Sequence, residues 1–218
     1  MWITNLVALG FGVLYCYKNY NPGYLRIFPP YLLVSFGVEV LVNPYINNIF
    51  NFRPFADHQR YAMYALYNLF TLFEIAVFSW FLFRIIRSAR IKILLVALLV
   101  FFLPFFIQSS YPLDLGRHFN DQAVLLESII IIIPCLVYFK ELFARPEPVD
   151  LLTEPAFWLV TGVFFYLATV FPLFLTRPYL QDLGMKKIAQ SLYSINNFAL
   201  SITYILFIKG YTCRIKRL

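Results

Sequence analysis

Hydrophobic residues in this chain fall into long runs that short polar stretches separate. A helix needs about 20 mostly apolar residues to cross the hydrocarbon core of a bilayer, where every backbone polar group must find an internal partner. Seven runs approach this length, at residues 2–17, 27–46, 61–83, 91–109, 122–139, 156–176 and 189–208. The pattern predicts an all-α fold, a polytopic membrane bundle of seven transmembrane helices that forms one domain over residues 1–218.

The polar stretches between the runs contain residues that favour turns. Asn-Pro-Gly occupies positions 21–23, Arg-Pro-Glu-Pro occupies 145–148, and Arg-Pro occupies 177–178. Because glycine and proline interrupt regular helices, these positions are predicted to be connections between spans. The run at 2–17 has no Lys or Arg before it, so we expect a retained helix and not a cleaved signal peptide.

The composition narrows the class of protein. Hydrophobic residues make up 61% of the chain and charged residues 13%, whereas soluble domains carry about 25% charged residues. The three cysteines lack the spacing of a metal site. No nucleotide-binding, DNA-binding or catalytic motif is recognisable. We therefore expect a membrane protein that is not an enzyme and that binds no cofactor, metal or nucleic acid.

Basic residues are distributed unevenly between the two sides of the predicted bundle. The side that holds the C-terminus carries 12 of the 18 Lys and Arg residues, and the opposite side carries 6. Because cytoplasmic loops are enriched in Lys and Arg, this bias predicts a cytoplasmic C-terminus and an external N-terminus. We expect a multi-pass protein of the inner (cytoplasmic) membrane, with the lipid bilayer as its first partner.

Weak internal similarity links the two halves of the chain. Pro30 and Gly37 recur as Pro155 and Gly162, at an offset of 125 residues. An odd number of spans allows two units of three helices with the same orientation, joined by the fourth span. The similarity is typical of a 3+1+3 plan with parallel repeats, as in sugar transporters of the SWEET type, and chance is the competing explanation.

Three glutamates, Glu39, Glu74 and Glu127, lie inside the predicted spans. A carboxylate within a bilayer is costly unless it faces the bundle interior and has a partner there. An ionisable residue in such a position is therefore a functional-site hypothesis in its own right.

Polar residues from four spans fall at one depth. Glu39, Asn68, Glu127 and Asn197 lie about six to eight residues inside the outer boundary, which is roughly 9–13 Å at 1.5 Å rise per residue. This layer predicts a polar pocket that faces the extracytoplasmic side. A spacing of four residues places Asn43 on the same helical face as Glu39, and Tyr193 on the same face as Asn197. The predicted ligand-binding set is Glu39, Asn43, Asn68, Glu127, Tyr193 and Asn197.

Glu74 lies about 9 Å deeper than this layer, and we expect it to be an isolated acid that couples to a proton or acts as a switch. A purely structural interpretation competes with function at every one of these positions. Asn and Tyr side chains often hydrogen-bond between helices only to hold them together. The acids can likewise be protonated and bonded to a neighbouring Asn or Tyr.

The chain resembles an uncharacterised family of short bacterial seven-pass membrane proteins. The residues that carry this resemblance are Tyr67-Asn68 with Glu74, the segment from Glu154-Pro155 to Tyr166, and Asn196-Asn197 with Tyr193, Tyr204 and Phe207. The resemblance covers most of the chain. It implies a membrane partner of signalling systems, including histidine kinases.

Three functions are compatible with these patterns. The first is a receptor-like sensory or signalling subunit that binds a small molecule or lipid in the outer polar pocket and relays the change to a separate membrane or cytoplasmic protein. The second is a small SWEET-like or proton-coupled transporter. The third is an assembly subunit of a larger membrane complex, whose aromatic faces would pack on partner subunits.

Overall fold

The computed structural model describes residues 2–17, 23–42, 59–109, 120–144 and 150–215. Within these ranges the chain is all-α, with seven α-helices, two short 3-10 helices and no strand. The elements are α1 (Trp2–Tyr17), η1 (Gly23–Ile27), α2 (Phe28–Val42), α4 (Gln59–Ile85), α5 (Ala89–Ser109), α6 (Asp121–Phe143), η2 (Leu151–Thr153), α7 (Pro155–Asp182) and α8 (Lys186–Ile215).

Five of the described helical segments are long and apolar enough to cross a membrane. They are Gly23–Val42, Met63–Ile85, Ala89–Gln108, Asp121–Phe143 and Pro155–Leu180. The apolar part of α1, Ile3–Tyr17, is shorter. The protein is therefore a multi-helix membrane protein, as the hydrophobic pattern predicts, whereas the count of seven spans stays a prediction.

Two proline positions show how the helix bounds follow from backbone chemistry. Pro29 and Pro30 lie in the first turn of α2, where the backbone N–H groups have no intrahelical acceptor and proline loses nothing. The prediction that Arg177-Pro178 forms a connection is wrong, because α7 continues through Pro178 to Asp182. Helices in membrane bundles tolerate internal proline since neighbouring groups compensate for the missing bond.

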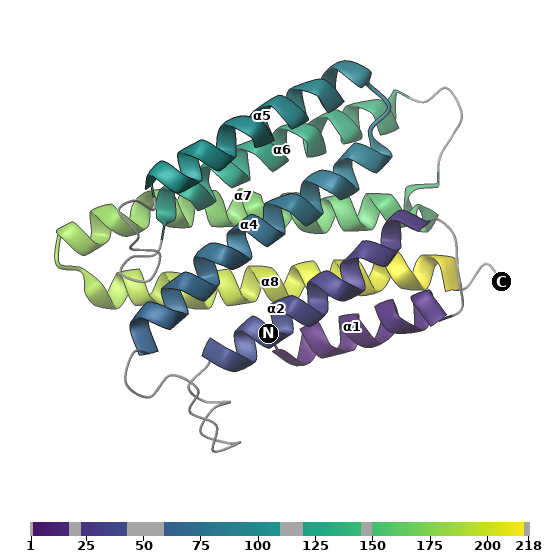
Figure 1. The fold of residues 1–218 in the computed structure, drawn as a ribbon. Coiled ribbons are helices and arrows are strands. Elements are labelled where there is room, and N and C mark those ends of the chain that lie inside the picture. Colours follow the sequence, from purple (N-terminus) through teal and green to yellow (C-terminus); the bar gives the residue numbers. More distant parts are fainter. Residues whose placement is uncertain (1, 18–22, 43–58, 110–119, 145–149, 216–218) are drawn as a thin grey trace.

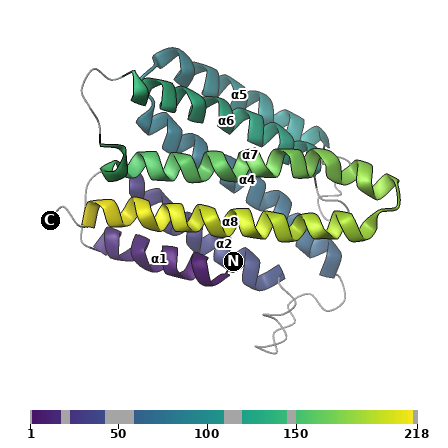
Figure 2. The same ribbon diagram turned by 180° about the vertical axis from the view of Figure 1, so that it is seen from behind.

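Six helices form a closed ring in chain order. Each of α1, α2, α4, α6, α7 and α8 contacts the next one, and α8 packs back against α1. Helices that follow one another along the chain, α5 included, run in opposite directions, so that within the ring α4 is parallel to α6 and α8 to α1. Helix α5 lies outside the ring against α6 (Figures 1 and 2). We call the end of the bundle at which α2, α5 and α7 begin and α8 ends the basal end, and the other end the distal end (Figure 1).

An aromatic cluster holds the basal half of the ring together. It consists of Phe28, Phe78, Phe81 and Phe207, which are all fully buried. The ring of Phe28 lies edge-on to Phe81 at 4.8 Å and to Phe207 at 4.9 Å between centroids. Such edge-to-face pairs are attractive because the positive ring edge meets the negative ring face. The cluster thereby joins α2, α4 and α8.

Close approach of α1 to its neighbours depends on a glycine. A Cβ atom at Gly12 would lie 2.8 Å from Cγ of Pro29 and 3.1 Å from Oη of Tyr211, whereas a Cβ at Gly10 would meet nothing within 4 Å. We expect Gly12→Leu to reduce stability by about 1–3 kcal/mol, because an inserted side chain must push α2 or α8 away. Thermal unfolding in detergent measures the effect. Gly10→Leu is the control on the same helix, and an equal loss in both variants would contradict this packing.

Candidate functional site

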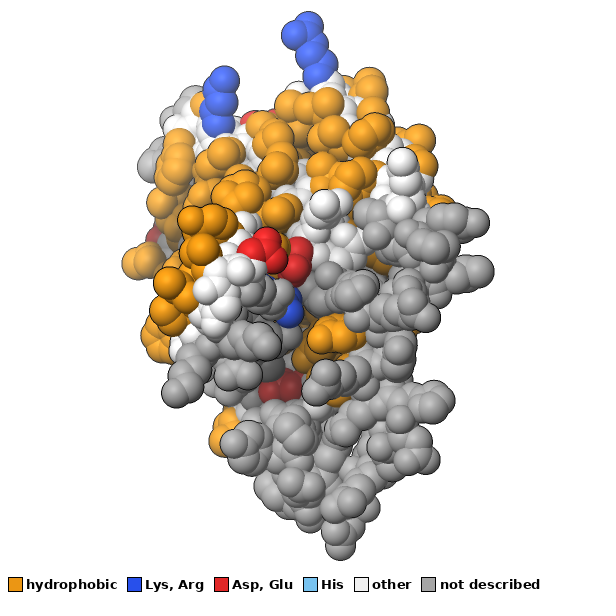
Figure 3. All heavy atoms as spheres, turned by 90° about the vertical axis from the view of Figure 1, so that its left-hand side faces the viewer, with side chains coloured by type: hydrophobic (Ala, Val, Ile, Leu, Met, Phe, Trp, Pro, Cys, Tyr) orange, Lys and Arg blue, Asp and Glu red, His pale blue; other side chains and the backbone are white. Residues whose placement is uncertain are grey.

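A cavity of about 440 Å³ lies between five helices of the ring. Its walls come from α2, α4, α6, α7 and α8, at positions toward the distal end of each helix, such as Val42, Met63, Val124 and Phe174. Figure 3 looks onto the distal end, where a few acidic side chains are visible on a surface that is otherwise largely hydrophobic in its described part. A cavity of this size is in the range that holds a small organic ligand.

All three intramembrane glutamates line this one cavity. Glu39 comes from α2, Glu74 from α4 and Glu127 from α6. Glu74 and Glu127 are 5% and 1% exposed, so both carboxyl groups are removed from bulk solvent. The ring order brings them together because α4 packs on both α2 and α6. A shared cavity is consistent with the functional interpretation and requires that the three acids be considered as one set.

Glu74 is not isolated, and the expectation that it would be is wrong. Oη of Tyr31 on α2 donates a hydrogen bond of 2.6 Å to Oε1 of Glu74 on α4. A hydrogen bond from a hydroxyl to a carboxyl group is short and strong in a water-poor interior. The ring of Tyr31 also lies 5.1 Å from the ring of Phe78. Tyr31 therefore connects the floor of the cavity to the aromatic cluster.

A second set of polar contacts links α2 to α8 and α1. Oγ of Ser35 on α2 and Oη of Tyr204 on α8 are 2.8 Å apart, within one hydrogen bond. Nδ2 of Asn5 on α1 donates a longer bond of 3.4 Å to the same Oγ. These contacts tie three helices together and give the Ser35 and Tyr204 hydroxyls partners within the protein.

Three residues that line the cavity each have one buried oxygen atom without a partner, unlike these bonded groups. Among the described residues, Oε2 of Glu39, Oε1 of Glu127 and Oδ1 of Asn196 have no hydrogen-bond partner. Buried polar atoms in proteins are almost always bonded, so each exception calls for an explanation. The cavity lining also contains no Lys, Arg or His among the described residues. The described lining thus has three acidic side chains, no basic one, and three buried oxygens without a partner.

The three glutamates are distributed around the cavity. In the described part of the chain, no three His, Cys, Asp or Glu side chains lie close enough together to hold one metal ion. Bidentate or multiple carboxylate ligation of a divalent cation needs oxygen atoms within about 2.0–2.6 Å of one point. The arrangement therefore fits an extended ligand better than a single point charge.

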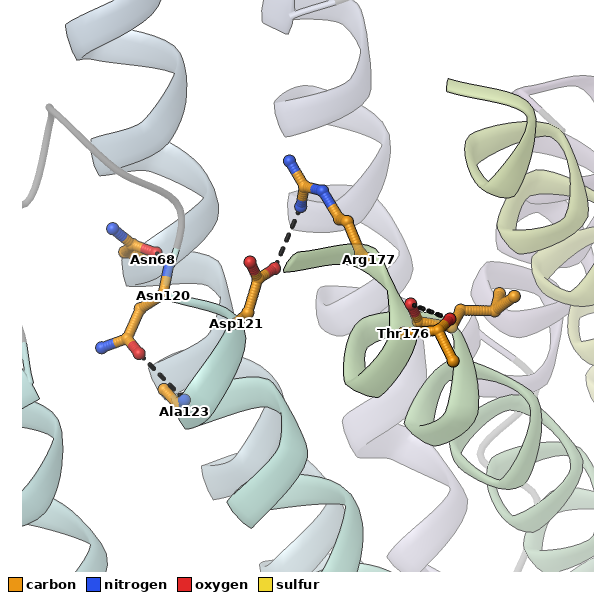
Figure 4. A network of polar contacts seen from close by, with 7 residues as sticks. Asn68, Asn120, Asp121, Ala123, Thr176 and Arg177 are labelled. Carbon is orange, nitrogen blue, oxygen red and sulfur yellow. Dashed lines mark hydrogen bonds and ion pairs between the residues drawn. The ribbon is translucent and has the colours of Figure 1, made fainter. Parts of the chain in front are cut away.

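Asn68 has a different position from the one that its depth predicts. Its Oδ1 accepts a hydrogen bond of 3.0 Å from the backbone N–H of Asn120, and Oδ1 of Asn120 accepts one of 2.9 Å from Ala123 (Figure 4). Asn120 is the N-cap of α6. Asn68 is buried and is not among the residues that line the cavity. It anchors the start of α6 to α4, because a buried amide takes the nearest unsatisfied backbone group.

An ion pair lies beside this anchor at the distal end. Nη1 of Arg177 on α7 is 3.0 Å from Oδ1 of Asp121, the first residue of α6 (Figure 4). The guanidinium group of Arg177 also lies over the ring of Phe174, which lines the cavity. The pair links α6 and α7 and places a cation beside Phe174 of the cavity lining.

Three residues of the predicted ligand-binding set remain, and the structure describes the side chain of only one of them. Asn197 lines the cavity. Asn43 lies outside the described residues, and for Tyr193 the structure describes the backbone of α8 but not the side chain. The ligand-binding role of the whole set stays a prediction.

The predicted ligand-binding set leaves out several polar residues that line the cavity. They are Tyr31, Ser35, Tyr67, Thr71, Tyr166 and Tyr204. A periodic signal for most of them was present. Tyr31 and Ser35 precede Glu39 at spacings of eight and four, and Tyr67 and Thr71 precede Glu74 at spacings of seven and three. Residues at these spacings share one helical face.

Comparison of the chain with protein-family models, with curated proteins and with solved structures finds no match. The resemblance to short bacterial seven-pass proteins therefore stays a prediction.

Proposed function

We propose that this protein is a receptor-like sensory subunit of the inner membrane that binds a small ligand in its distal cavity. The observation that carries the proposal is the cavity itself, which combines three glutamates from three helices with unpartnered acceptor oxygens. On its basal side, Tyr31 contacts the fully buried aromatic cluster. A cavity that is polar toward one end of a bundle and closed by packed rings toward the other suits ligand binding from one side.

The proposed orientation places the basal end in the cytoplasm and the N-terminus outside. Of the Lys and Arg side chains that the structure describes, seven lie at the basal end and one, Arg177, at the distal end. The seven are Arg26, Arg84, Arg87, Arg90, Lys92, Lys140 and Lys209. This asymmetry follows the positive-inside rule. With α1 and α8 also crossing the bilayer, the chain would span it seven times and the cavity would open to the outer side.

In the proposed mechanism, the ligand changes how the helices pack. A ligand that bonds to Glu39 on α2, Glu127 on α6 and Asn197 on α8 would draw these helices toward it. Pro134 in α6 and Pro172 in α7 supply positions at which the backbone hydrogen bonding is interrupted and a helix can bend. The shift would reach the basic basal face, where a separate signalling protein would dock.

Access to the cavity is testable with single cysteines in membrane vesicles. Cys16, Cys135 and Cys213 are first replaced by serine or alanine, and Leu200, which lines the cavity, is replaced by cysteine. We expect a membrane-impermeant thiol reagent to modify Leu200→Cys in right-side-out vesicles and not in inverted ones. Ile205→Cys is the control, because Ile205 is on the same helix and 54% exposed on its outer face, where lipid excludes the reagent. Modification from the inverted side alone would contradict the orientation.

Partner recovery separates the three functional candidates. The tagged full chain is crosslinked in its native membrane, purified in gentle detergent and examined by mass spectrometry. A stoichiometric signalling protein would support the receptor subunit. A secretion or envelope complex would favour the assembly role, and a lone monodisperse protein would favour transport.

A proton-coupled transporter is the second candidate, and the Tyr31–Glu74 pair is the observation that favours it. Both residues line the cavity, and the ring of Tyr31 also contacts Phe78 of the aromatic cluster, so a moving proton or helix could link the two. The internal similarity of Pro30 and Gly37 to Pro155 and Gly162 would fit a 3+1+3 transporter plan.

Proton flux in liposomes tests the transporter. The full chain is reconstituted with an internal pH-sensitive dye, and candidate small-molecule substrates are added outside. Substrate flux coupled to Glu74 predicts substrate-dependent acidification by the wild type that falls at least about tenfold in Glu74→Gln and persists in Glu154→Gln, a change outside the cavity lining. Flux that Glu74→Gln leaves unchanged would remove Glu74 from the mechanism.

A further inference from the structure

We propose that the ligand of the distal cavity is a small protonated organic amine with an apolar body. The inference rests on the proposed function, because it names the ligand class of the same cavity. It follows from the charge, the hydrogen-bonding capacity and the shape of the walls.

The charge of the walls favours a cation. Glu39, Glu74 and Glu127 line the cavity, and no basic side chain among the described lining residues faces them. Carboxyl groups in a water-poor site are stabilised by a nearby opposite charge, and an unbalanced set of them is costly within a membrane. The nearest described cation at the distal end, Arg177, already pairs with Asp121. A positively charged ligand would supply the missing balance.

The hydrogen-bonding capacity favours a ligand rich in donors. The cavity-lining residues Glu39, Glu127 and Asn196 each have one buried oxygen without a partner, and an amide oxygen or the oxygen of an ionised carboxylate can only accept a hydrogen bond. A primary ammonium group has three N–H donors and no acceptor, as in the side chain of lysine. A quaternary ammonium carries the same charge but has no N–H donor and would leave these oxygens unsatisfied. The pattern therefore distinguishes an amine from a fully alkylated cation.

The remaining lining is suited to an apolar body next to the ammonium group. Val38, Val170 and Leu200 present aliphatic surface, and Phe70 and Tyr166 present aromatic surface. Aromatic faces also attract cations directly. A bare metal ion would leave most of the 440 Å³ unfilled, and the three glutamates do not group around one metal position in the described chain. An organic ammonium uses both the acidic and the apolar parts of the wall.

Binding of three matched probes tests the ligand class. Full-length protein in lipid nanodiscs is titrated calorimetrically with 2-phenylethylamine, with 2-phenylethanol, which lacks the charge, and with trimethyl(2-phenylethyl)ammonium, which lacks the donors. We expect the amine to bind at least about tenfold more tightly than either analogue. Glu127→Gln should weaken amine binding at least about tenfold, and Glu154→Gln should not change it. Equal binding of the alcohol, or no binding of the amine, would overturn the proposal.

A second measurement separates failure of the ligand class from failure of the proposed function. Leu200→Cys, in the background without native cysteines, is treated from the distal side with a cationic and an anionic methanethiosulfonate reagent of similar size. An acidic cavity predicts at least about tenfold faster modification by the cationic reagent. Equal rates, or a faster anionic reagent, would overturn the amine class while the cavity stays accessible. If neither reagent reaches the cysteine, the distal cavity and the proposed function are both contradicted.

Discussion

The double variant Glu39→Gln with Glu127→Gln should lose the cellular response that depends on this protein and still accumulate in the membrane. Both carboxyl groups line the cavity, and each has one buried oxygen without a partner among the described residues. Glutamine keeps the size of the side chain but removes the negative charge and adds donors where the site has acceptors. Loss of a buried charge partner costs about 2–5 kcal/mol of binding, which reduces affinity by well over tenfold.

The response is measured in a strain from which the gene is deleted. The response is defined as the set of transcripts whose levels change when the gene is deleted and are restored by expression of the wild-type chain. Membrane abundance and thermal stability of the double variant should match those of the wild type, because the unpaired oxygens contribute no hydrogen bond to the fold. Glu154→Gln removes an acid that is not among the lining residues and should restore the response in full. A full response in the double variant would refute the role of these glutamates.

Phe28→Ala should cause the largest loss of stability of any single substitution in the aromatic cluster. Phe28 is fully buried and its ring contacts Tyr31, Phe78, Phe81 and Phe207 on three helices. Removal of a buried phenylalanine ring costs about 3–5 kcal/mol, because the contacts are lost and a cavity remains. The free energy of unfolding in mixed detergent micelles measures the effect.

Phe101→Ala is the matched control for this deletion. Phe101 lies on α5, outside the ring, and is 59% exposed, so lipid covers most of its side chain. Truncation at an exposed position typically changes stability by less than about 1 kcal/mol. A similar loss at both positions would show that the cluster contributes no more than an ordinary lipid-facing ring. A large loss at Phe28 alone would support the cluster as the closure beneath the cavity.

The helices themselves were predictable from local information. A membrane segment needs about 20 apolar residues, and each helix satisfies its backbone hydrogen bonds within its own segment. Hydropathy therefore located every described helix, and α1 and α2 begin within two residues of the predicted positions. The prediction failed at Arg177-Pro178, where packing against neighbouring helices lets α7 continue through a residue that ends helices elsewhere.

The polar site was only half predictable. Depth along a span identified Glu39, Glu127 and Asn197, which the structure brings to one cavity. Depth alone also suggested that Glu74 lies apart from these residues. Depth along one helix does not show which helix lies opposite or how that helix is rotated. Tyr31 reaches Glu74 because α2 and α4 are neighbours in the ring. Asn68 has a suitable depth but bonds to Asn120, at the start of a helix from the other half of the chain.

The amino-acid sequence by itself determined the all-α membrane class, the positions of the helices and the presence of three acids within them. It could do so because these properties depend on residues close together along the chain. The tertiary structure alone decided the ring order, the place of α5 outside the ring, and the meeting of Glu39, Glu74 and Glu127 at one cavity. These features depend on how side chains of different helices fit together, and such contacts between distant residues leave no periodic signal in a single sequence.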